Sequence, residues 1–171
     1  MTGTSDRERL WERLCGLLDD DPELWPAVRL ALTDPARYAT ERAAALPSGA
    51  AEDADDGVPV DVWSALLDGL DDAGALVYLD AADAGAELVA ALGAAPRVVR
   101  AGVGLDPLLD DGTDLFGSLA HADLLLSAAG LALVLLEEDS DAYPLVVVPA
   151  RAVDEVVALA LELGGAAHPV R

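Results

Sequence analysis

The sequence predicts an α/β fold: a small mixed sheet of three or four strands that includes a β-hairpin near the C-terminus, helices on both faces, and a helical N-terminal section. Two apolar runs, at residues 131–136 and 145–148, flank a short acidic segment, which is the pattern of a hairpin. Neither run alternates with polar residues, so we expect both faces of each strand to be buried. Stripes of helical period elsewhere in the chain can supply the covering helices.

The N-terminal section, residues 1–46, is predicted to form three short helices. Ser5 and Glu8 make a capping box ahead of a leucine stripe. The Asp-Pro pairs at 21–22 and 34–35 each resemble an N-cap followed by proline in the first turn, so a helix should begin at each pair. We expect this section to belong to one domain with the rest of the chain, because 171 residues is an ordinary domain length.

Residues 47–59 are small and acidic and contain no apolar anchor, which predicts a flexible loop. The α/β core is predicted to span residues 60–171. It should begin with a helix capped by Asp61, followed by a strand at 75–80 and a helix capped by Asp83. A strand that leads directly into a helix indicates a crossover unit, and therefore parallel pairing with a later strand.

The segment 94–112 carries weaker signals, and the pair 98–99 predicts a short edge strand. An apolar stripe predicts a helix over 113–130, directly before the hairpin. Pro144 and Pro149 lie in the second hairpin strand. They confine that strand to a sheet edge, or to positions whose N–H is not needed.

The end of the chain is predicted to form a helix over 152–163 and then a frayed tail that contains His168. His121, on the polar side of the preceding predicted helix, is expected to be structural. Cys15 is the only cysteine, which excludes an internal disulfide. Its position among leucines predicts a buried core thiol.

The net charge of −22 comes from 32 acidic residues against ten arginines, and the chain contains no lysine. Without a basic surface, binding to nucleic acid or to an anionic membrane is excluded. The charge suits a basic protein partner, although a GC-rich coding bias or solubility alone also explains it. The charged N-terminus does not resemble a signal peptide and no apolar run is long enough to span a membrane, so we expect a cytoplasmic protein.

Familiar catalytic motifs fail at their key residues. The segment 110–113 resembles the end of the haloacid-dehalogenase phosphatase motif, but Leu109 stands where the nucleophilic aspartate is required. Gly102 and Gly104 form a G-x-G without the third glycine of a dinucleotide site. The absence of lysine excludes a P-loop and a Schiff base, and two isolated histidines make no zinc motif. We therefore predict no catalytic and no cofactor-binding residues.

Carboxylates at the ends of the predicted strands are the remaining candidates for chemistry. If strands 75–80 and 131–136 are parallel neighbours, their acidic ends converge, and oxygen-only ligands suit Mg²⁺ or Ca²⁺. The predicted metal ligands are Asp80, Asp83, Asp139 and Asp141, with Glu87, Glu138 and Tyr143 as further candidates. The alternative is that these aspartates serve as turn and cap residues.

Three segments resemble parts of a known family. They are Tyr78-Leu79-Asp80 at the end of a strand, Glu87-Leu88 in the following helix, and residues 138–143 (EDSDAY) in the hairpin. Together they resemble an uncharacterised bacterial family, the domain of unknown function 6630, over roughly residues 60–163. The resemblance implies the boundaries of the fold and supplies no mechanism.

Two classes of function remain. The first is a non-enzymatic binding or regulatory module, of the kind represented by immunity proteins, whose acidic surface meets a basic protein partner. The alternative is a metal-assisted hydrolase with an acidic Mg²⁺ or Ca²⁺ site at the strand C-termini. A homodimer formed through an exposed edge of the hairpin is compatible with either.

Overall fold

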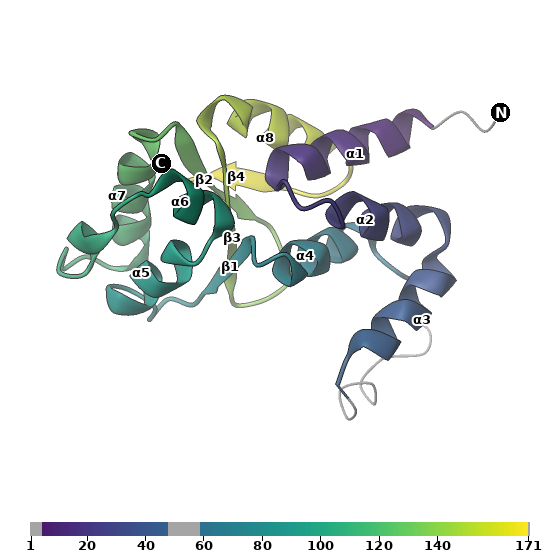
Figure 1. Ribbon diagram of the computed structural model, residues 1–171, viewed down its shortest axis with the longest axis horizontal. Helices are drawn as coiled ribbons and strands as arrows, with labels where there is room; N and C mark the ends of the chain where they lie inside the picture. The colour runs from purple at the N-terminus through teal and green to yellow at the C-terminus, as the bar shows by residue number, and fades with distance from the viewer. Residues whose placement is uncertain (1–4, 48–58, 171) are drawn as a thin grey trace.

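The computed structural model, which describes residues 5–47 and 59–170, confirms the predicted α/β fold with its C-terminal hairpin and helical N-terminal section (Figure 1). Residues 48–58, which make up nearly all of the predicted loop at 47–59, lie outside the described part. The strands are β1 (Leu76–Leu79), β2 (Leu131–Leu136), β3 (Tyr143–Pro149) and β4 (Ala167–Pro169). The helices are α1 (Asp6–Leu18), α2 (Leu24–Thr33), α3 (Pro35–Ala45), α4 (Val62–Asp72), α5 (Ala86–Gly93), α6 (Pro96–Ala101), α7 (Leu115–Ser127) and α8 (Val153–Glu162), with 3₁₀ turns η2 (Asp106–Leu108) and η3 (Ala150–Ala152).

The four strands lie in the order β1-β3-β2-β4, and every neighbouring pair is antiparallel. The predicted parallel pairing of the first strand with 131–136 is therefore wrong, and the sheet is not mixed. The second hairpin strand, β3, lies between β1 and β2. It is the longest strand of the sheet, and it pairs with β1 over residues 143–146 and with β2 over residues 145–149.

The two prolines of β3 explain how this strand can be central. Pro144 lies opposite Tyr78 of β1, at a position that the β2 ladder does not reach. Pro149 lies opposite Leu131 of β2, beyond the end of the β1 ladder. Of the two predicted alternatives, an edge strand is wrong. Each proline instead stands where only one neighbouring strand is present, so at most one ladder is affected by its missing N–H.

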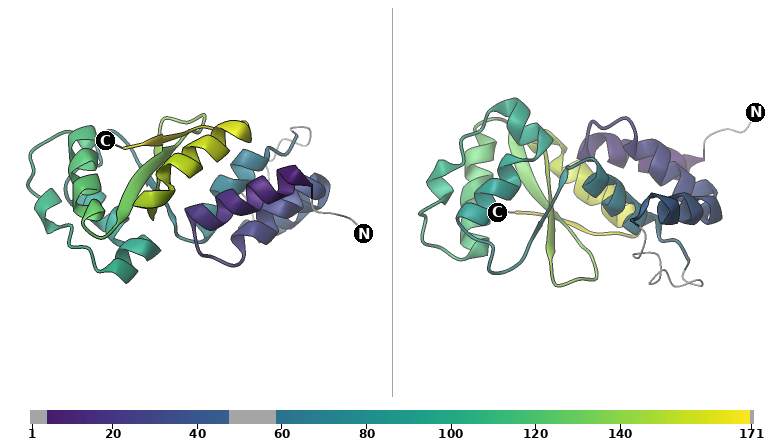
Figure 2. Two further views of the ribbon diagram at one scale, coloured as in Figure 1. Left: turned by 90° about the horizontal axis from the view of Figure 1, so that it is seen from above. Right: turned by 60° about the horizontal axis from the view of Figure 1, so that its bottom comes forward.

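Helices cover both faces of the sheet, and Figure 2 shows the three layers from above. The helices α1, α2, α4 and α8 pack against one face, where Val134, Leu136, Val146 and Val148 belong to their core. On the other face, α5, α6 and α7 enclose a second core that contains Leu133, Leu145 and Val147. Successive residues of β2 and β3 alternate between these two cores, as the period of a strand requires. The predicted burial of the hairpin on both sides is confirmed.

Three of the five predicted caps begin a helix, and they are Ser5, Asp34 and Asp61. Ser5 and Glu8 form the capping box of α1, and Asp34 accepts a hydrogen bond from the backbone N–H of Arg37 at the start of α3. The pair Asp21-Pro22 behaves differently, because Asp21 accepts from the N–H of Glu23 in a turn and α2 begins only at Leu24. A single Asx turn thus delays the helix by two residues.

Two predictions near the sheet edges are wrong. Residues 98–99 lie in α6, which is enclosed by Pro96 at its start and by Gly102 in a left-handed conformation (φ +65°) at its end, so they form no strand. The tail with His168 is not frayed, because it pairs with β2 as the edge strand β4. The N–H of Val170 donates to the carbonyl of Leu133 and extends that contact.

Arg97 joins the two helical layers through the interior. Its side chain extends from α6 and is only 8% exposed. Its Nη1 atom donates to the carbonyls of Leu17 and Leu18 at the end of α1, both at 2.9 Å, and to the carbonyl of Val147 at 3.0 Å. Val147 is the first residue of β3 beyond the β1 ladder. The guanidinium thus supplies a hydrogen-bond donor to β3 next to the first residue of β1, where the pairing of the two strands stops.

Within the described residues, no helix combines the length and the apolar character that crossing a bilayer requires.

Candidate functional site

A cavity of about 360 Å³ opens between the N-terminus of α4 and the loop that joins β2 to β3. Its lining residues come from two segments far apart in the sequence, and they are Asp61, Trp63, Ser64, Leu67, Glu137, Glu138 and Asp139. Four of the seven carry carboxylates and none is basic. We call this cavity the acidic pocket. Two of its residues, Glu138 and Asp139, were predicted as site candidates from the sequence.

Trp63 connects the two sides of the acidic pocket. Its indole N–H donates to the carbonyl of Glu137 at 2.8 Å, which attaches the start of α4 to the end of β2. The ring packs against Trp11 of α1, with 6.4 Å between centroids, and lies directly against the backbone of Gly165. The indole is 9% exposed, so it forms a rigid wall rather than a mobile side chain.

Asp61 is positioned by the helix that it caps. Its carboxylate accepts from the backbone N–H groups of Trp63 and Ser64, both at 3.3 Å, and from the Ser64 hydroxyl at 3.1 Å. The negative charge therefore lies at the positive end of the α4 dipole, where it is stabilised.

The loop carboxylates are held more loosely. Glu138 accepts from the Tyr78 hydroxyl at 3.4 Å and from the Ser140 hydroxyl at 3.1 Å. Partial burial, and next the nearby Glu138 carboxylate, raise the pKa of Tyr78 to about 12, so this phenol stays a donor at neutral pH. Glu137 faces the ring of His168 at 3.4 Å, and Asp139 is exposed. These charges are accessible to a ligand from solvent.

The four predicted metal ligands do not form a metal-binding group among the described residues. Asp83 accepts from the backbone N–H of Asp80 at 2.9 Å, and Asp80 accepts from the N–H of Ala82 at 2.7 Å, so both stabilise the turn after β1. Asp139 and Asp141 lie in the hairpin loop that leads into β3, and this loop ends beside the end of β1, because Leu79 pairs with Tyr143. Within residues 5–47 and 59–170, no three His, Cys, Asp or Glu side chains form a group that could hold a metal ion.

Glu87 and Tyr143, the other predicted site candidates, lie outside the acidic pocket. Glu87 lies exposed in the first turn of α5, which begins after Gly85 (φ +65°) and not after Asp83 as predicted. Tyr143, at the start of β3, packs edge-to-face on Phe116 with 5.1 Å between ring centroids. Neither residue lines the acidic pocket.

Comparison with protein families identifies the chain. The model of the family described as Domain of unknown function (DUF6630) matches residues 10–170, almost the whole sequence. The chain belongs to the DUF6630 family. The match extends beyond the predicted range of 60–163 and includes the N-terminal helices. Neither a search of curated proteins nor a search of solved structures found a match.

A second polar cluster in this DUF6630 protein was missed from the sequence. Both carboxylate oxygens of Asp111 accept from the Ser118 hydroxyl, at 2.9 and 2.8 Å, and His121 lies 3.6 Å away. The hydrogen bond from Ser118, followed by those from Thr113 and His121, lowers the pKa of Asp111. Ser118 is completely buried, so no substrate reaches its hydroxyl in this structure. The cluster is structural, and it anchors the Asp-Gly-Thr turn to α7.

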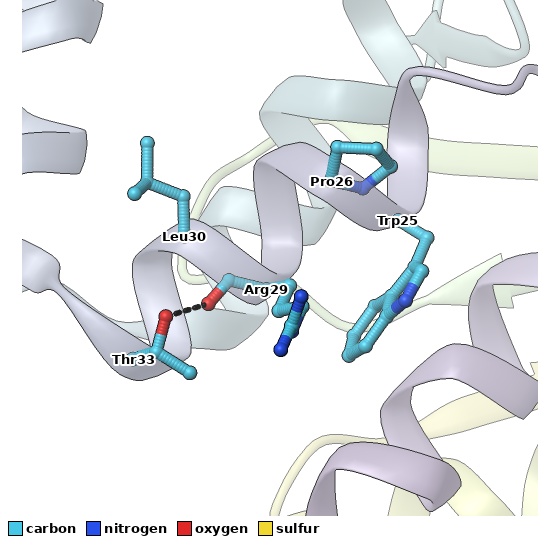
Figure 3. Close-up of a pocket in the computed structure, with 5 residues that line it drawn as sticks. All are labelled: Trp25, Pro26, Arg29, Leu30 and Thr33. Carbon is cyan, nitrogen blue, oxygen red and sulfur yellow. Dashed lines mark hydrogen bonds between the residues drawn. The ribbon is translucent and has the colours of Figure 1, made fainter. Parts of the chain in front are cut away.

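Figure 3 shows another pocket, of about 260 Å³, that is lined by residues of α2. Trp25 and Arg29 project from successive turns of the helix, and the Thr33 hydroxyl donates to the carbonyl of Arg29 at 2.8 Å. The only charged side chain of this pocket is Arg29, which already pairs with Glu8 at 3.3 Å. It therefore offers less distinctive chemistry than the acidic pocket.

Cys15 provides a direct test of the core. Burial raises the pKa of its thiol to about 12, and only the thiolate reacts with alkylating agents. We expect Cys15 to remain unmodified by iodoacetamide in the folded protein and to react fully in guanidinium chloride, as measured by mass spectrometry. Equal labelling rates in both conditions would contradict the buried position.

Proposed function

We propose that this DUF6630 protein is a non-enzymatic binding or regulatory module that receives a basic partner protein on its acidic surface. The observation that carries the proposal is the acidic pocket, with four carboxylate residues and no basic one, in a chain of net charge −22. A site of one charge sign attracts partners of the opposite sign over distances longer than direct contact.

The distribution of arginine supports this proposal. In the described α/β core, from residue 59 to 170, the arginines are Arg97, Arg100 and Arg151. Arg97 and Arg100 both bind Asp20 of the N-terminal section, at 3.3 and 2.7 Å. Neither they nor Arg151 line the acidic pocket. Its charge is therefore left for an external cation.

The alternative of a metal-assisted hydrolase requires carboxylates gathered around an ion. The described residues supply no such group, and the predicted ligands Asp80 and Asp83 are engaged in a turn. No feature of the geometry favours this alternative, so we advance only the binding role.

The proposal is tested with a hexa-arginine peptide and isothermal titration calorimetry. The triple variant E137Q/E138Q/D139N removes three exposed or half-exposed charges from the acidic pocket with little change in shape. We expect it to weaken binding about tenfold at low ionic strength, because exposed ion pairs contribute up to about 1 kcal/mol each. Added salt should reduce the difference.

The matched control is E87Q/D106N/D110N, which removes the same number of exposed charges around α5 and η2. It should bind the peptide within about twofold of the wild-type protein, since none of the three residues lines the acidic pocket. If both triple variants weaken binding equally, the acidic pocket has no special role and the proposed function fails.

A further inference from the structure

A second, apolar pocket of about 230 Å³ lies on the opposite face of the sheet, between α7 and strand β4. Phe116 and Leu119 of α7 form one wall, and Leu135 and Leu145 of the sheet form the floor. His168, Pro169 and Val170 complete the side toward β4. We call this cavity the anchor pocket.

An exposed aromatic ring marks the opening of the anchor pocket. Phe116 is 55% exposed although it lines an apolar cavity, and its ring is supported edge-to-face by Tyr143. Aromatic residues of this kind, held rigid beside a pocket, are typical of binding surfaces. The cavity is smaller than the roughly 300–1,000 Å³ typical of drug-sized ligands, and its size suits a single apolar side chain.

The anchor pocket and the acidic pocket meet at the end of β2. Leu135 of β2 lines the anchor pocket, and Glu137 directly follows the last residue of this strand. His168, which lines the anchor pocket, approaches the Glu137 carboxylate to 3.4 Å. Glu137 also lines the acidic pocket. A segment seated in the anchor pocket would therefore have carboxylates beside it, and no arginine lines either cavity.

We propose that the anchor pocket receives an aromatic or large aliphatic side chain from a basic segment of the partner protein, while the flanking basic residues face Glu137 and its neighbours. This inference rests on the proposed function and specifies the partner: cationic residues on both sides of one apolar anchor. Charge complementarity selects this occupant. A second copy of the chain would bring another net charge of −22 to the same place, which is unfavourable.

The test compares two capped peptides, Arg-Arg-Phe-Arg-Arg and Arg-Arg-Ser-Arg-Arg, by titration calorimetry. Wild-type protein should bind the phenylalanine peptide at least about tenfold more tightly, because burial of one aromatic side chain is worth that factor or more. Phe116→Ser should remove this preference. Leu124→Ser, also on α7 and 69% exposed but outside the anchor pocket, should retain it.

The outcomes separate the inference from the proposed function. Equal binding of the two peptides to wild-type protein would overturn the anchor pocket, even if E137Q/E138Q/D139N still weakens both and the acidic pocket stands. A preference that survives in Phe116→Ser would overturn it as well. Self-association of the wild-type protein that Phe116→Ser abolishes, measured by analytical ultracentrifugation, would assign the anchor pocket to a second copy instead.

Discussion

Replacement of Arg97 by methionine is expected to lower the free energy of unfolding by about 3–5 kcal/mol, because two buried carbonyls and the half-buried carbonyl of Leu17 lose their donor. Each such loss at a buried carbonyl costs roughly 1–3 kcal/mol. Two of these carbonyls, of Leu17 and Leu18, lie at the negative end of the α1 dipole, where a cation is favourable. Methionine fills a similar volume without a donor. For a domain of this size we expect the melting temperature to fall by about 10 °C.

Arg100→Met is the matched control for Arg97→Met. Arg100 lies on the same helix and binds the same Asp20, but its side chain is 57% exposed. Its loss should cost less than about 1 kcal/mol, as for other exposed ion pairs. Chemical denaturation of both variants provides the measurement. Similar losses for the two would show that the buried carbonyls contribute little and that Asp20 accounts for the effect.

Gly165→Ala is expected to destabilise the protein by about 2–3 kcal/mol and to disturb the acidic pocket. A Cβ atom at this position would lie 2.3 Å from the ring of Trp63. The ring cannot move aside freely, because its N–H is bonded to the carbonyl of Glu137 and its face packs near Trp11. Overpacking of this kind typically costs 1–3 kcal/mol. The measurement is the denaturant midpoint together with tryptophan fluorescence.

Gly16→Ala is the control for Gly165→Ala. It is the same substitution, and we expect it to stabilise the protein. Gly16 lies inside α1, and a Cβ atom there meets nothing within 4 Å. Alanine should stabilise the helix by about 0.5–1 kcal/mol, because glycine loses more backbone entropy on folding. A Gly165→Ala variant as stable as the wild-type protein would indicate that Trp63 is not fixed as described.

The predictions that the structure confirms are those that depend on a few neighbouring residues. Ser5, Asp34 and Asp61 were predicted as caps and act as caps, because the signal lies within four residues of each helix start. The burial of β2 and β3 on both faces follows from their unbroken apolar runs. Asp83 was wrongly predicted as a cap, because its carboxylate bonds back to the N–H of Asp80 in the turn after β1 and α5 begins only after Gly85.

The candidate site was only half predictable. Glu138 and Asp139 were identified as carboxylates at a strand end, which is a local pattern. Asp61 was predicted only as a helix cap, and nothing in the sequence around α4 linked Trp63 to a loop more than seventy residues later. That link depends on the hydrogen bond between the Trp63 indole and the Glu137 carbonyl, which only the folded chain brings together.

By itself, the sequence determined the two-sided apolar hairpin, the positions of most helices and the acidic character of the surface, because each depends on residue type and short-range period. The tertiary structure decided the strand order, the pairing of the C-terminal tail as β4, the internal role of Arg97 and the meeting of α4 with the hairpin loop. These depend on which backbone groups remain unpaired once the core has formed. Hydrogen bonds between groups far apart in the sequence cannot be predicted from a pattern of neighbouring residues.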